Sequence, residues 1–337
     1  MTLEERIDAF ARLGSTIKNI SEEDLDSLCR RVENNNNWFS PAQTKNALNS
    51  LLVFLNKGSL THWLASYNLP ETVDPKSIGI LMAGNIPAVG FHDLMCVLLS
   101  GHRACIKLSS PDQVLINWLI EKLVSIEPKF KSLISVEEML KNKDAYIATG
   151  SDNSARYFEY YFGKYPNIIR KNRTSVGILD GSEKKEDFRK LAKDIFQYYG
   201  LGCRNTSKIF VPNKALLISF LDSIQDFSEI ADNHKYFHNY EYNKSILLVN
   251  KEEHLDNGFL ILQQSKGLVS PISVLYYEVY QSMEELNNLV SLASDKIQCI
   301  LSRGAWFTGS LDLGQAQCPV LDDYADGIDT ISFLKNL

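Results

Sequence analysis

The sequence predicts an α/β protein in which a doubly wound parallel sheet is followed by a second α/β region. A length of 337 residues leaves room for about two domains of ordinary size. Hydrophobic residues make up 45% of the chain and charged residues 23%, as in folded globular proteins. From residue 77 onward, short apolar strands alternate with helical windows, and this alternation is typical of parallel strands joined by helical crossovers.

The N-terminal part, up to about residue 68, is expected to be helical. Leu3, Ile7 and Phe10 recur at the spacing of one helix face, and Leu48 and Leu51 repeat this spacing later. A polar asparagine run separates the two patterns. We therefore expect several helices before the first strand.

The alternating region should form a sheet of four strands. Its strands are expected at residues 78–82, 103–108, 145–148 and 175–179, and its helices at 91–99, 114–124 and 155–162. Ligands of such sheets bind at the carboxyl ends of the strands. The loops that follow the strands are therefore the first place to look for a nucleotide site.

A second α/β region should follow Gly181. It begins with a charged amphipathic helix over residues 183–199 that ends at Gly200, whose missing Cβ suits a left-handed cap. Further strands are expected at 208–211, 245–249, 272–279, 297–301 and 330–333, with helices at 215–224 and 283–292.

The charge pattern argues against nucleic acid as a partner. The chain has 35 basic and 41 acidic side chains, a net charge of −6, and no long block of either sign. No apolar run approaches the ~20 residues that span a bilayer, and the start of the chain is acidic where a signal peptide is basic. We expect a cytoplasmic protein with a small-molecule substrate. Its six cysteines contain no C-x-x-C pair and are expected as free thiols.

Cys203 is the candidate nucleophile. It follows the glycine-rich helix exit at residues 200–202 and precedes a strand, so a loop holds it, and the adjacent Arg204 would favour the thiolate. The alternative is that Cys203 is a small buried residue. His234 and His238 have the spacing of two metal ligands on a helix, but no third ligand motif accompanies them, so no metal is expected.

Polar loops follow three successive predicted strands. Asn85 could donate its amide to an oxyanion or make an Asx-Pro turn, and His92 and Asp93 could orient Asn85 or cap the next helix. The serines of the other two loops could instead cap helices. Jointly the loops favour a nucleotide site, for which the candidate cofactor-binding residues are Lys107, Ser109, Ser110, Thr149, Gly150 and Ser151.

Four segments resemble motifs of the aldehyde dehydrogenase superfamily, in the same order. They are residues 84–87 (its Trp-Asn-Phe-Pro), 104–110 (Val-Leu-Lys-Pro-Ser-Glu), 148–151 (Phe-Thr-Gly-Ser) and 200–203 (Gly-Gln-x-Cys). Residues 90–93 and 317–327 are similar to the LuxC branch, the acyl-CoA reductases that make long-chain aldehyde for bacterial luciferase. The resemblance implies an aldehyde dehydrogenase-like fold, with Cys203 as nucleophile and Asn85 as oxyanion donor.

The resemblance also implies a division of the chain and an oligomer. We expect N-terminal helices and the cofactor domain at 1–180, a catalytic domain at 181–310, and a C-terminal segment at 311–337 that returns to the core or to an oligomer interface. The resemblance to the superfamily implies that the protein forms a homo-oligomer, a dimer or a tetramer.

Departures from the superfamily pattern favour a reductase. The segment 169–174 lacks the carboxylate that serves the superfamily as general base, so a hydrolytic step has no base. Ser110 replaces the glutamate that binds the adenosine ribose, leaving room for a 2′-phosphate near Lys107, which favours NADPH. Gly267 stands where a glutamate would contact the nicotinamide ribose.

The expected function is therefore NADPH-dependent reduction of a long-chain acyl thioester, carried by CoA or by a partner protein, to a fatty aldehyde. Two alternatives stay open. One is an NAD-dependent aldehyde dehydrogenase, and the other is a non-catalytic acyl-binding or scaffold subunit.

Overall fold

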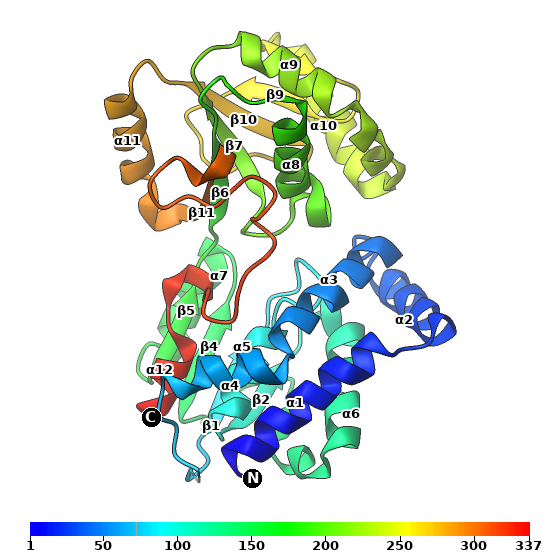
Figure 1. Ribbon diagram of the computed structural model, residues 1–337, viewed down its shortest axis with the longest axis vertical. Helices are drawn as coiled ribbons and strands as arrows, with labels where there is room; N and C mark the ends of the chain where they lie inside the picture. Colours follow the sequence, from blue (N-terminus) through cyan, green and yellow to red (C-terminus); the bar gives the residue numbers. More distant parts are fainter. Residues whose placement is uncertain (72) are drawn as a thin grey trace. The chain divides into compact units, whose positions relative to one another are not determined.

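A computed structural model describes residues 1–71 and 73–337 (Figure 1). The chain forms two compact units. The first contains Met1–Asn172 together with Val320–Leu337, and the second contains Arg173–Pro319. Each unit has its own sheet.

The first unit is built on a five-stranded parallel sheet with the order β3-β2-β1-β4-β5. Leu81 at the end of β1 pairs with Lys107 of β2 and Ala148 of β4, so the three carboxyl ends share one edge. The strand order reverses between β1 and β4, which creates a topological switch point beside β1. The strands are β1 (Ser77–Leu81), β2 (Arg103–Lys107), β3 (Ile134–Val136), β4 (Ala145–Thr149) and β5 (Asn167–Arg170).

Helices cover this sheet as the apolar periodicity predicts. The N-terminal helices are α1 (Leu3–Lys18), α2 (Glu22–Asn35), α3 (Pro41–Phe54) and α4 (Lys57–Ala65), and α1 packs against α5 (Phe91–Leu99) and α6 (Gln113–Ile126). The ring of Phe10 lies 6.2 Å from that of Phe91 in this interface. A capping box between Thr2 and Glu5 fixes where α1 begins. The expectation of an α-helical N-terminal part is confirmed.

The second unit contains a six-stranded sheet with the order β11-β6-β7-β10-β9-β8, parallel except for the β8–β9 pair. Its strands are β6 (Thr174–Ile178), β7 (Thr206–Val211), β8 (His254–Asp256), β9 (Ile261–Gln264), β10 (Val274–Val279) and β11 (Ile297–Ser302). Its longer helices are α8 (Lys185–Phe196), α9 (Ala215–Ser223), α10 (His234–Asn250) and α11 (Met283–Leu292).

Three expected strands are corrected by the structure. The segment 175–179 is not the fourth strand of the first sheet, because residues 175–178 lie in β6, which pairs with β7 and β11. The segment 245–249 lies inside α10, where Asn233 caps the helix and Tyr236, Tyr240 and Leu247 recur on its buried face. The segment 330–333 begins α12 (Thr330–Lys335), which Asp329 caps.

The C-terminal segment returns to the first unit. Leu321, Tyr324, Ile331 and Leu334 are buried in its core. The chain passes from the first unit to the second between Asn172 and Arg173, where a boundary at residue 180 was expected, and returns between Pro319 and Val320. The strand β6 pairs with β7 and β11 of the second sheet. Across residues 1–71 and 73–337, no helix combines the length and the apolar character needed to cross a bilayer.

Candidate active site

The candidate loops of the first unit meet at one sheet edge. Asn85 follows β1 and is exposed, Lys107 ends β2, and Thr149 ends β4. Ser151 caps α7 (Asp152–Phe162) by accepting the backbone N–H of Ser154 at 3.2 Å, so the capping alternative holds for this serine. The sheet thus brings the sequence-predicted residues of this unit together.

The turn after Lys107 is anchored by a residue that the sequence did not single out. The Asn35 amide nitrogen donates to the carbonyl oxygens of Ser110 at 2.9 Å and Pro111 at 3.1 Å. Its oxygen accepts from the side chain of Gln113 at 3.1 Å. These bonds leave the Ser110 side chain exposed at the surface of the turn.

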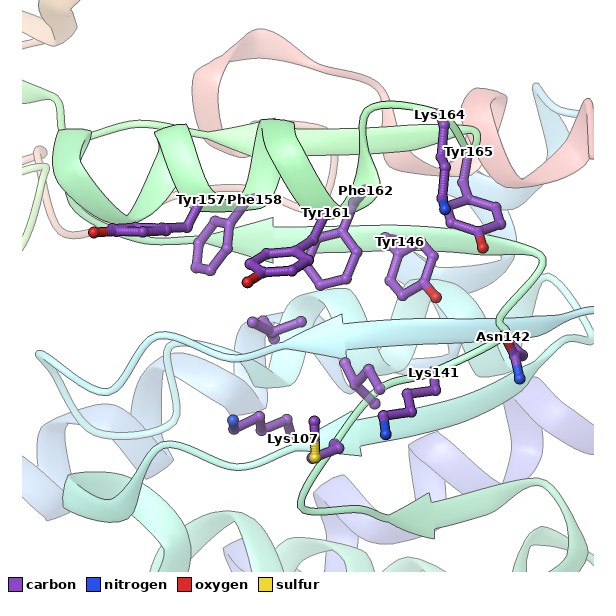
Figure 2. A pocket seen from close by; sticks show the side chains of 13 residues that line it. Lys107, Lys141, Asn142, Tyr146, Tyr157, Phe158, Tyr161, Phe162, Lys164 and Tyr165 are labelled. Atoms are coloured by element: carbon purple, nitrogen blue, oxygen red, sulfur yellow. The ribbon is translucent and has the colours of Figure 1, made fainter.

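A cavity of about 560 Å³ lies between α7 and the sheet (Figure 2). Tyr157, Phe158, Tyr161 and Phe162 project from α7 toward the strands, and Lys107 lines the cavity from the sheet side. The aromatic residues are spaced four apart, which places them on one helix face, and this was the available sequence signal. A cavity of this size with aromatic walls and a cation can hold a flat heteroaromatic group attached to phosphate.

His92 and Asp93 lie in the first turn of α5, which begins without a side-chain cap. His92 Nε2 is 3.1 Å from the carbonyl oxygen of Leu321, and Asp93 forms a buried ion pair with Arg170 at 2.6 Å. Burial lowers the pKa of His92, so its imidazole is neutral near pH 7. Both residues therefore attach the C-terminal segment and β5 to α5.

In the second unit, Cys203 lies on a tightly wound turn between α8 and β7. Tyr198, Tyr199 and Gly200 all adopt left-handed backbone conformations, with φ of 53°, 57° and 78°. Such conformations are costly for residues with a Cβ and persist where the surrounding structure holds them. Cys203 itself is half-buried, so the alternative of a fully buried cysteine does not hold.

Asn205 fixes this turn, and its role was not evident from the sequence. Its side-chain oxygen accepts from the Gly202 N–H at 2.8 Å, and the Asn205 N–H returns to the Gly202 carbonyl at 3.0 Å. Asn205 is 2% exposed. Its amide nitrogen donates to three carbonyl oxygens at the end of α8, those of Asp194, Ile195 and Gln197. One buried side chain therefore ties the cysteine turn to α8.

Two further contacts hold the backbone on either side of the thiol. Ser175 on β6 donates its hydroxyl to the Cys203 carbonyl oxygen at 3.2 Å. The Arg204 Nε donates to the carbonyl oxygen of Ala316. Because Arg204 is engaged with the segment that follows β11, its guanidinium has a structural role beside the electrostatic one expected from the sequence.

Asp194 joins α8 to that same segment. Its carboxylate accepts the backbone N–H groups of Gly314 at 2.5 Å and Ala316 at 3.0 Å, and it is 1% exposed. Burial raises the pKa of Asp194 to about 6, although the two N–H bonds oppose this increase. The support of the Cys203 turn thus contains a carboxyl group that titrates near neutral pH.

We expect Asp194 to make the stability of the second unit depend on pH. The folded protein binds this proton more tightly than the unfolded chain, so the stabilisation is complete below about pH 4 and is lost as the pH rises through 6. Asp194→Asn removes this titration. Urea unfolding should show the stability difference between wild type and variant increasing by about 1 kcal/mol from pH 8 to pH 5. Parallel pH profiles would contradict the assignment.

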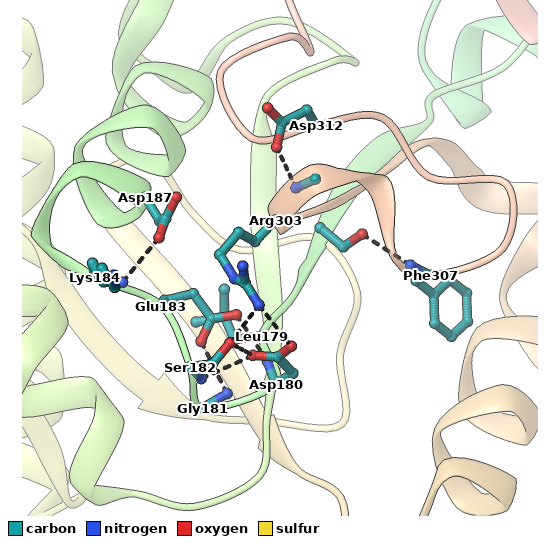
Figure 3. Close-up of polar contacts among 12 residues, drawn as sticks. Leu179, Asp180, Gly181, Ser182, Glu183, Lys184, Asp187, Arg303, Phe307 and Asp312 are labelled. Carbon is teal, nitrogen blue, oxygen red and sulfur yellow. Dashed lines mark hydrogen bonds and ion pairs between the residues drawn. The ribbon is translucent and has the colours of Figure 1, made fainter.

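A separate network of polar contacts lies in the loops that follow β6 and β11, at the carboxyl ends of these strands (Figure 3). Glu183 accepts from the backbone N–H groups of Asp180 and Gly181, and Arg303 binds Asp180 and Ser182. These groups hold one another in the loops after the strands. Cys203 precedes β7 and so lies toward the amino end of the same parallel strands.

The structure also shows where the other cysteines and the histidine pair lie. None of the six cysteines forms a disulfide with another described residue; Cys318 is exposed, and Cys29, Cys96, Cys105 and Cys299 are buried. In the part of the chain that the structure describes, no three His, Cys, Asp or Glu side chains gather as a metal site. His234 and His238 both lie on α10.

The fold is that of the aldehyde dehydrogenases. Aldehyde dehydrogenase 21 from Physcomitrella patens superimposes with a TM-score of 0.67 and 12% identity over 100% of this chain and 84% of that one. An aldehyde dehydrogenase of Mycobacterium tuberculosis, complexed with NAD+, gives 0.63 and 12% over 90% and 73%. The expected fold class, with its doubly wound parallel sheet and second α/β domain, is confirmed.

Within that fold, the chain belongs to the acyl-CoA reductase (LuxC) family, whose model matches residues 8–220. A long-chain acyl-protein thioester reductase of Aliivibrio fischeri is 21% identical over 168 residues. The match covers 45% of this chain and 35% of that protein, so it spans about a third of the relative's length.

Proposed function

We propose that this protein reduces an acyl thioester to an aldehyde with NADPH, and that Cys203 carries the acyl group between the two half-reactions. The observation that carries the proposal is the Cys203 turn, where a buried asparagine and a strained backbone hold a half-buried thiol in one place. Backbone held in a costly conformation next to a side chain is typical of a site where that side chain reacts. Membership of the acyl-CoA reductase family supports the reaction class.

In the first half-reaction, the Cys203 thiolate attacks the carbonyl carbon of the thioester. The S–C bond to Cys203 forms and the bond to the departing thiolate breaks, so the acyl group is transferred without a change of oxidation state. The Asn85 amide and the Cys203 backbone N–H are the proposed donors to the oxyanion. The leaving thiolate takes up a proton from solvent.

In the second half-reaction, the thioacyl group is reduced and leaves as an aldehyde. The nicotinamide cofactor, when bound, supplies the hydride. Collapse of the resulting thiohemiacetal breaks the S–C bond and regenerates the Cys203 thiolate. No water has to be activated, which is consistent with Arg170 being held in an ion pair at the segment where the superfamily's base would lie.

The first unit has features that fit the adenosine half of such a cofactor. Its switch point places the loops after β1 and β4 side by side, and the aromatic cavity beside Lys107 has the volume of a cofactor site. We assign the adenosine side to Lys107, Ser109 and Ser110. The helix start at 149–151 is assigned to the pyrophosphate.

The exposed Ser110 is the basis for preferring NADPH. We expect Ser110→Glu to raise the KM for NADPH by about 10-fold or more, because a carboxylate there repels the 2′-phosphate. The ratio of kcat/KM for NADPH to that for NADH measures the preference. Ser125→Glu, on the exposed side of α6, is the matched control. An unchanged ratio would remove Ser110 from cofactor selection.

The acyl donor is CoA or an acylated partner protein, and the chain is proposed to work in the cytoplasm as a homo-oligomer. A conventional aldehyde dehydrogenase would instead form free acid from aldehyde without CoA. The test is NADPH oxidation by the purified protein with tetradecanoyl-CoA, with the aldehyde identified. Aldehyde formation supports the reductase; acid formation from aldehyde, or failure to bind either cofactor, favours one of the alternatives.

A further inference from the structure

Asp112 carries a carboxyl group buried beneath the Asn85 loop. It ends the 3₁₀ turn Ser110–Asp112 directly before α6, but its side chain does not cap that helix. Its Oδ2 accepts the backbone N–H of Ala88 at 2.8 Å. Asp112 is 2% exposed, and its Oδ1 has no hydrogen-bond partner within residues 1–71 and 73–337. The usual role of an aspartate at a helix start is therefore not the one seen here.

The residue that Asp112 holds is conformationally strained. Ala88 has a φ of 59°, a left-handed conformation that a residue with a Cβ rarely adopts. Its carbonyl oxygen accepts the Phe91 N–H at 3.0 Å, the bond with which the chain turns into α5. The Asp112 bond thus acts where the Asn85 loop changes direction.

The other side of Asn85 is held through the same turn. A Cβ added to Gly84 would lie 2.4 Å from Ser109 Oγ and 3.4 Å from the Asp112 Cβ. Gly84 therefore packs directly on the turn that contains Ser109 and Asp112, and only glycine fits. The loop after β1 therefore contacts the turn after β2 on both sides of Asn85, by packing at Gly84 and by a hydrogen bond at Ala88.

The surroundings favour the neutral acid at this position. Burial raises the pKa of Asp112 well above its usual value, and the single N–H bond offsets this only in part. A neutral carboxylic acid has nearly the shape and polarity of a carboxamide. Asparagine is therefore a close substitute that retains the acceptor for the Ala88 N–H.

We propose that Asp112 is a positioning residue that holds the Asn85 loop in the orientation needed for oxyanion stabilisation. The inference rests on the proposed role of Asn85. It adds that the contact between Asp112 and Ala88, rather than the loop sequence alone, sets where the Asn85 amide lies.

The test is a double-mutant cycle between Asp112→Leu and Asn85→Ala. The measured quantity is the single-turnover rate of CoA release from tetradecanoyl-CoA without nicotinamide cofactor, so that altered nucleotide binding does not contribute. Asp112→Asn tests rescue by the conservative change, and Asp112→Ala replaces the leucine variant if that variant does not fold. Glu121→Ala, exposed on α6, is the matched control.

We expect Asp112→Leu to slow CoA release about 10-fold in the wild-type background and less than about 2-fold in the Asn85→Ala background. Asp112→Asn should stay within about 3-fold of wild type. Equal slowing in both backgrounds would overturn the inference while leaving the role of Asn85 intact. A normal rate in Asn85→Ala alone would overturn both.

Discussion

Cys203→Ala is expected to abolish acyl-CoA-dependent NADPH oxidation, with a loss of at least about 10⁴-fold in kcat. Removing the nucleophile removes the covalent step itself. Comparable losses of kcat follow removal of the nucleophile in hydrolases that form a covalent acyl intermediate. The variant should fold normally, since the Cys203 side chain is half-buried and the turn is held by Asn205. Steady-state kinetics and a thermal unfolding curve measure the two properties.

Cys318 supplies the matched control for this prediction. It is an exposed thiol on the same unit, so Cys318→Ala removes the competing site for thiol chemistry without touching the turn. We expect its turnover to equal that of the wild type. Retained activity in Cys203→Ala would exclude the covalent route.

Asn85→Ala should lower kcat by about 10²–10³-fold and leave thermal stability nearly unchanged. Loss of one preorganised donor to an oxyanion has this magnitude, and the Asn85 side chain is exposed rather than part of the core. The loss should appear already in CoA release. A cofactor-binding defect would appear instead as a raised KM for NADPH.

An exposed asparagine on a helix serves as control for the alanine change. Asn46 lies on α3 of the same unit, and Asn46→Ala should turn over like the wild type. If Asn85→Ala has wild-type kcat, the oxyanion donor must lie elsewhere.

The sequence predicted correctly those elements for which the local residue pattern and the tertiary packing favour the same secondary structure. The strands β1, β2 and β4 are apolar on both faces and alternate with periodic helices, so their assignment needed no long-range information. The segment 245–249 has the β-branched and apolar residues of a strand, yet it continues α10, because the buried face of that helix includes Leu247. Tertiary packing decides such segments.

The candidate site divides in the same way. Cys203 and the strand-end loops carry recognisable residue types in recognisable places. The residues that hold them in place have no such sequence signature. Asn35 forms hydrogen bonds to the Ser110 turn, 75 positions away in the sequence, and Asp194 accepts a hydrogen bond from Gly314, 120 positions away. An asparagine or aspartate with such a role looks like any other cap or turn residue until its partner is in view. Asp112 stands next to the predicted loop and was still missed for this reason.

The most direct test of the central claim is the mass of the protein after mixing with tetradecanoyl-CoA in the absence of any nicotinamide cofactor. We predict that one tetradecanoyl group is added, that peptide mapping places it on Cys203, and that NADPH then removes it as aldehyde. An acyl group on Cys318 or on no residue, while aldehyde is still formed, would contradict the account.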